Sequence, residues 1–72
     1  MNNLEFGISE SGFVTLKVYD ILGEEIETLV SKQLNPGSYE VEFNGSKFSS
    51  GIYFYTLTVG NFSLTKKMNL IK

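Results

Sequence analysis

Apolar and polar residues alternate along almost the whole chain, and turn residues interrupt the pattern about every ten residues, as in β-sandwich domains. Alternation places successive side chains on opposite faces of a strand and predicts half-buried β-strands. The clearest case is the segment in which Tyr39, Val41 and Phe43 alternate with Ser38, Glu40 and Glu42. Six strands are predicted, over residues 4–8, 13–19, 24–33, 38–43, 51–59 and 62–71. This pattern favours an all-β, antiparallel sandwich.

The predicted connections carry residues that favour tight turns. Residues 20–23 read Asp-Ile-Leu-Gly, with Gly23 supplying a positive φ, and residues 35–37 read Asn-Pro-Gly, which fits a type II turn. Gly60-Asn61 suits a two-residue hairpin of type I′ or II′. Residues 44–50 are expected to form a loop, and Gly7, which lies inside a strand, suggests a bulge.

Residues 24–33 are the one segment whose pattern also fits a helix. Ile26, Leu29 and Val30 have the i, i+3, i+4 spacing of a helical stripe, but the flanking turns read as hairpin turns and favour a strand. On a strand, Glu25 and Glu27 would share one face. We interpret these carboxylates as a solvated face and not as an acid–base pair or a calcium site.

Composition excludes several classes of function. The 72 residues contain no cysteine, histidine or tryptophan, which removes disulfides, zinc and haem ligation through these residues, and Ser-His or Cys-His catalysis. A net charge of −2 provides no basic footprint for nucleic acid. Residues 48–65 carry no charge, but their hydroxyl side chains and the Gly60-Asn61 turn argue against a transmembrane helix. We expect a domain that is not an enzyme and needs no cofactor.

The order and spacing of five motifs resemble the type A C-terminal sorting domain of type IX secretion cargo, the Por secretion system of certain Gram-negative bacteria. A related family is the immunoglobulin-like domain of flagellar hook-capping proteins. The motifs are residues 12–23, Leu29-Val30, Pro36-Gly37-Ser38-Tyr39, residues 50–55 and the terminal Lys66-Lys67-Met68-Asn69-Leu70-Ile71-Lys72.

This resemblance implies an immunoglobulin-like β-sandwich of six to seven strands without a helix. It implies that the domain directs a secreted cargo through the periplasm to an outer-membrane translocon. A sortase-like peptidase then removes the domain, and the cargo is anchored at the cell surface or released. The residues that match the family's recognition motifs are Gly51, Tyr53, Lys67, Met68, Leu70, Ile71 and Lys72.

The chain departs from the family pattern near its start. The Asn-Pro-Phe-Asn-Pro segment expected before Leu4 is missing, and Ser9 stands where proline is usual. We therefore expect residues 1–72 to be one domain, truncated at its N-terminal edge. Its open sheet edge would be capped by the chain's own terminus or by a second copy, giving a homodimer.

Two alternative interpretations belong to other functional classes. An accessory carbohydrate-binding module would expose Tyr53 and Tyr55 as a platform, whereas a structural immunoglobulin-like module would only space other domains. Lys66 and Lys67 fit either a docking site for an acidic partner or an edge strand protected against aggregation.

Overall fold

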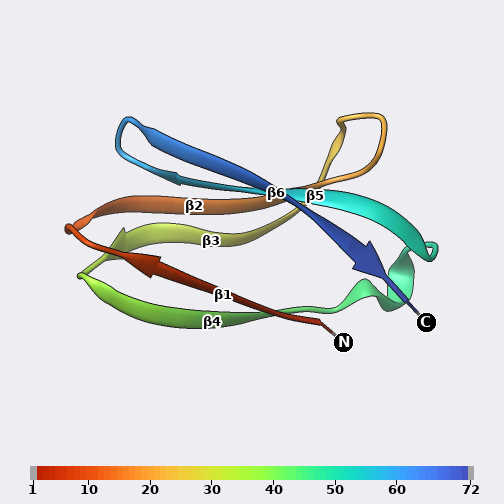
Figure 1. Ribbon diagram of the computed structural model, residues 1–72, viewed down its shortest axis with the longest axis horizontal. Helices are drawn as coiled ribbons and strands as arrows, with labels where there is room; N and C mark the ends of the chain where they lie inside the picture. Colours follow the sequence, from red (N-terminus) through yellow and green to blue (C-terminus); the bar gives the residue numbers. More distant parts are fainter. Residues whose placement is uncertain (1, 72) are drawn as a thin grey trace.

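The computed structural model describes residues 2–71 and contains six strands (Figure 1). The all-β class is confirmed, and one turn of 3-10 helix, η1, lies inside the predicted loop. The elements in order are β1 (Asn2–Ile8), β2 (Gly12–Tyr19), β3 (Glu25–Leu34), β4 (Gly37–Phe43), η1 (Gly45–Lys47), β5 (Gly51–Val59) and β6 (Phe62–Leu70).

The strands form two antiparallel sheets of unequal width. One sheet has two strands, β1-β4, and the other has four, in the order β3-β2-β5-β6. Figure 1 shows the small sheet lying along the large one as a second layer. The arrangement is that of a small immunoglobulin-like sandwich, as the sequence predicted.

Among the described residues, nine buried apolar residues form the core between the inner faces of the two sheets. Val14, Leu16 and Val18 alternate along β2 and are almost fully buried, because β2 lies in the middle of the wide sheet. Phe43, from the small sheet, is also fully buried. The remaining members are Leu4, Val30, Tyr53, Leu57 and Leu70.

Two bulges in β3 explain its helix-like spacing. The register with β2 shifts twice, once between Leu16 and Lys17 and once between Val18 and Tyr19. At the first shift Leu29 is an extra residue in β3, and at the second Ile26 is. The bulges allow Ile26, Leu29 and Val30 all to contact the core although they do not alternate. The strand, and not the helix, is confirmed for this segment.

The bulge at Ile26 overturns the prediction that Glu25 and Glu27 share a face. Glu27 pairs with Val18, whose side chain lies in the core, whereas Glu25 pairs with Tyr19 on the other side of the sheet. On the outer face, Glu25 forms an ion pair with Lys17 at 3.3 Å. The bulge predicted at Gly7 is also wrong, since β1 pairs with β4 without a register shift.

The two hairpin turns follow the prediction, and the proline turn does not. Gly23 has a φ of 87°, and Asp20 Oδ1 accepts hydrogen bonds from the backbone N–H groups of Leu22 and Glu24 at 2.9 Å. Gly60 has a φ of 57° and Asn61 does not have a positive φ, which selects the type II′ hairpin. Residues 35–36 instead lead from the wide sheet to the narrow one, and Gly37 has a φ of 152°, far from the type II value.

Strands β4 and β5 begin with the same local structure. Each opens with Gly-x-Tyr, and Gly37 and Gly51 have φ values of 152° and 149°, which L-residues with a side chain rarely adopt. Two residues later, the hydroxyl of Tyr39 donates to the Asn35 carbonyl at 2.5 Å and that of Tyr53 donates to the Ser49 carbonyl at 2.7 Å. Each tyrosine therefore ties the incoming loop to the start of its strand.

Removing the Tyr53 hydroxyl should measurably destabilise the domain. We expect Tyr53→Phe to lower the free energy of unfolding by about 0.5–1.5 kcal/mol, the usual net value of such a hydrogen bond. Tyr55→Phe is the matched control, because within residues 2–71 the Tyr55 hydroxyl has no hydrogen-bond partner. Urea denaturation measures both variants, and equal effects would contradict a specific role for the Tyr53–Ser49 bond.

Candidate recognition surface at the C-terminal strand

The antiparallel register of β5 and β6 places the two predicted recognition motifs side by side. Gly51 pairs with Leu70, Tyr53 pairs with Met68, and Lys67 lies opposite Phe54. Residues that are 13 to 19 positions apart in sequence are thereby brought together at one end of the wide sheet, because antiparallel strands joined by a tight turn bring their far ends together. In this group, called the patch below, Tyr53, Met68 and Leu70 lie on the inner face of the sheet and Lys67 lies on the outer face. The patch lies at the end of the sandwich where the chain leaves β6 (Figure 1).

Tyr53 belongs to the interior of this patch. Its side chain is 8% exposed, and its ring lies 6.3 Å from that of Phe48 in a tilted arrangement. Phe48 in turn stacks on the fully buried Phe43, with ring centroids 5.8 Å apart. The aromatic series connects β5 to β4 through the loop between them, so Tyr53 acts as a packing residue that holds the loop in place.

Leu70 anchors the end of β6 against the η1 turn. Its side chain is 4% exposed and packs directly on the backbone of the buried Gly45. A Cβ atom at Gly45 would lie 2.5 Å from Leu70 Cδ1, closer than real Cβ contacts allow. The turn itself is capped by the Asn44 side chain, which accepts a hydrogen bond from the Ser46 N–H at 3.1 Å. A side chain at position 45 and the observed Leu70 position are therefore incompatible.

The other motif residues are accessible. Lys67 and Gly51 are exposed, Met68 is half-buried, and Ile71 is 82% exposed immediately after β6 ends. Lys72, also predicted as a recognition residue, lies outside the described residues. Within residues 2–71, no carboxylate lies within ion-pair distance of Lys67, so its charge is available to an acidic group.

Some of the residues that build the patch were not predicted from the sequence. Gly45, Phe48 and Ser49 all lie in the predicted loop, and each contacts a motif residue. Gly45 does not have a positive φ, so local turn chemistry offered no sign that Leu70 would pack on it. Nor does the sequence around Phe48 and Ser49 indicate their contacts with Tyr53, because the fold brings the loop against β5.

The sugar platform considered for Tyr53 and Tyr55 is not present in this fold. Both rings lie on the inner face of the wide sheet, and Tyr53 is buried with its hydroxyl on the Ser49 carbonyl. The outer face presents Phe54 and the Thr56–Thr65 hydroxyl pair, whose oxygens are 2.8 Å apart. Tyr53 and Tyr55 therefore do not form an exposed, coplanar pair.

The structure is therefore a small immunoglobulin-like β-sandwich in which β6 is an edge strand. The buried Leu70 holds the end of β6, and most of its other side chains are exposed. A family model described as the secretion system C-terminal sorting domain matches residues 2–72. The chain therefore belongs to this family, whose members are sorting signals for type IX secretion. Comparisons with curated proteins and with solved structures find no match.

Membership in this family implies interaction with the secretion machinery and export to the cell surface or beyond, as part of a larger protein. Among the described residues, no helix is long and apolar enough to span a membrane.

A methyl group at position 45 should displace Leu70. We expect Gly45→Ala to destabilise the domain by about 1–3 kcal/mol, the usual cost of overpacking, and Leu70→Ala to cost about 2–5 kcal/mol. The double variant should be more stable than the sum of the two effects predicts, because the smaller side chain leaves room for the methyl group.

Gly7→Ala is the matched control for this substitution. The nearest atom to a Cβ at Gly7 would be the Gly37 carbonyl oxygen at an ordinary 3.7 Å, and Gly7 also lacks a positive φ. Chemical denaturation of the four variants measures the coupling. If the effects of Gly45→Ala and Leu70→Ala on the free energy of unfolding were additive, the packing of Leu70 would not require glycine at position 45, which would contradict the prediction.

Proposed function

We propose that this domain carries an attached cargo through the type IX outer-membrane translocon, and that the machinery binds the patch formed by the start of β5 and the end of β6. The observation that supports this most directly is the division of the motif residues. Tyr53 and Leu70 are buried and hold the patch, whereas Lys67 and Ile71 are exposed beside them. A folded surface together with the last strand would then be the signal.

Such an arrangement suits recognition because the exposed residues are held in place before binding. Leu70 is packed on Gly45, so the neighbouring Ile71 leaves the sandwich from a defined position. A partner loses less free energy in ordering a segment that is already fixed at one end. In this proposal, Ile71 enters an apolar site on the machinery, and Lys67 pairs with a carboxylate there.

The later steps follow the family pattern. The cargo would pass through the periplasm, and a sortase-like peptidase would remove the domain at the cell surface before the cargo is anchored or released. The domain would take no part in bond cleavage itself. Capping of an open sheet edge by the chain's own terminus or by a second copy stays a prediction from the sequence.

Charge reversal at Lys67 should block export without unfolding the domain. A reporter with a Sec signal is fused in front of residues 1–72, and its surface delivery is measured in strains with and without a working translocon. We expect delivery to require the translocon, and to be lost in Lys67→Glu and in Ile71→Ser, since both remove exposed contacts and spare the core.

Lys32→Glu is the matched control, because Lys32 is an exposed lysine on β3, the opposite edge strand of the wide sheet. Circular dichroism and denaturation verify that all three variants fold. Delivery that does not depend on the translocon would overturn the proposed function. Equal export of Lys67→Glu and Lys32→Glu would overturn the assignment of the surface.

A further inference from the structure

The two-stranded sheet is too narrow to cover the inner face of the four-stranded sheet. Strand β4 contacts β3 at one side of the sandwich, and β1 lies next to β4. Among residues 2–71, no strand pairs with the other edge of β1, so that edge presents free backbone N–H and C=O groups. Immunoglobulin-like constant domains place further strands at such positions, with sheets of four and three strands.

An apolar groove runs between this free edge and the uncovered part of β5 and β6. It has a volume of about 190 Å³ and is bounded by residues 4–7 of β1 on one side and by Leu57, Phe62 and Leu64 on the other. Phe62 and Leu64 are 58% and 43% exposed although they lie on the inner face of β6.

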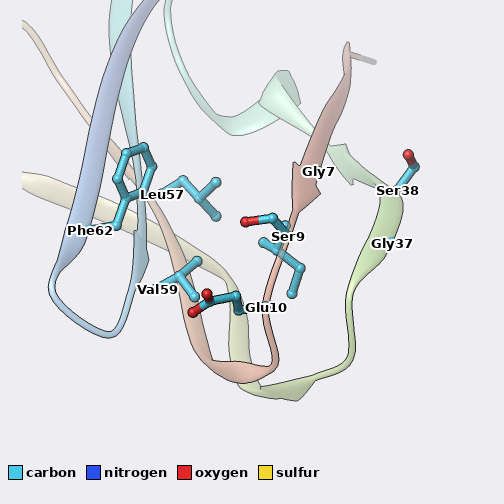
Figure 2. A pocket seen from close by; sticks show the side chains of 9 residues that line it. Gly7, Ser9, Glu10, Gly37, Ser38, Leu57, Val59 and Phe62 are labelled. Carbon is cyan, nitrogen blue, oxygen red and sulfur yellow. The ribbon is translucent and has the colours of Figure 1, made fainter.

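The groove opens toward the β5–β6 turn. Figure 2 shows the side chains of Leu57, Val59 and Phe62 pointing into this wider region, with Ser9 and Glu10 on its other side. The uncovered surface therefore continues past the end of β1. An extended segment laid along β1 would cover it.

Charges around the groove define what such a segment should carry. Glu5 lies directly opposite Glu40 on the outer face of the narrow sheet, and both side chains are exposed. Two carboxylates in this position repel each other, and a cation beside them would relieve the repulsion. Lys66 lines the inner side of the groove from β6, so a basic residue is favoured on the outer side only.

We propose that the free edge of β1 binds an extended segment of another protein by strand addition. The segment would form backbone hydrogen bonds with β1, place alternate apolar side chains over Phe62 and Leu64, and place a lysine or arginine on the outer face beside Glu5. Main-chain pairing of this kind provides affinity, and alternate side chains provide specificity. The bound strand would widen the narrow sheet to three strands.

The charges favour such a segment over a second copy of this chain. Antiparallel pairing of two β1 strands about their centres would place Glu5 of one copy beside Glu5 of the other, and each copy already carries a net charge of −2. Like charges directly opposite each other destabilise strand pairs. The proposal concerns a different surface from the patch at the end of β6 and does not rest on the secretion role.

A synthetic peptide tests the proposal on the 72-residue chain as it stands. The probe alternates valine with lysine and has the length of β1. Its two controls are a peptide that alternates valine with glutamate and a scrambled valine–lysine peptide. We expect saturable binding of the alternating lysine peptide alone, with slowed amide hydrogen exchange in β1. Equal binding of the scrambled peptide, or protection elsewhere without β1, would overturn the proposal.

Variants with matched controls locate the binding site. Glu5→Lys should weaken binding about tenfold, because an exposed attraction becomes a repulsion of similar size. Glu24→Lys makes the same charge change in the β2–β3 turn, at the other end of the sandwich from the β5–β6 turn (Figure 1), and should have little effect. Equal effects of the two substitutions would overturn the predicted position of the basic residue.

The apolar wall has its own control. Phe62→Ser should weaken binding about tenfold through lost apolar contact. Phe13→Ser should not weaken it, since Phe13 is 54% exposed but alternates with the buried Val14 and faces outward. Sedimentation of the chain alone completes the test. A dimer that protects the β1 amides from exchange would show that a second copy occupies the groove and would overturn the proposal.

Discussion

Two strands face four in this sandwich, and the mismatch in width determines where the core lies and where the surface remains apolar. Leu4 and Phe43 of the narrow sheet meet Val14, Leu16 and Val18 of β2, and these residues are buried because both layers are present there. On β6, Phe62 and Leu64 have the same inward orientation but no layer beneath them. The hydrophobic effect favours burial of both sets, but only the first set is covered by the opposite sheet.

The end of β6, unlike its beginning, is packed against the loop that precedes β5. Leu70 packs on Gly45, and Tyr53 closes the preceding loop through its hydroxyl and its ring contact with Phe48. With no cysteine in the chain, such packing contacts have to replace the disulfides on which many small domains depend. The exposed Lys67 and Ile71 therefore lie beside a residue whose position is fixed, as the proposed recognition of this surface requires.

The strand pattern was predictable because side-chain alternation is a local property of an extended chain. Val14, Leu16 and Val18 alternate with polar or exposed residues within the predicted strand over residues 13–19, and the structure buries all three. Residues 24–33 were ambiguous because two bulges in β3 disturb the alternation, and the face of Glu27 was predicted wrongly for the same reason. A bulge depends on how a strand fits its neighbour, so one strand read alone does not reveal it.

The sequence by itself determined the class of fold, the positions of the strands, the hairpin turns at Gly23 and Gly60, and the family, since all of these follow from short-range patterns and motif order. Only the tertiary structure decided that Leu70 packs on Gly45, that the Tyr53 hydroxyl binds the Ser49 carbonyl, and which part of the wide sheet the narrow sheet leaves uncovered. The first and the last of these depend on atoms brought together from distant parts of the chain. Their approach is set by the stacking of the two sheets and not by local preference.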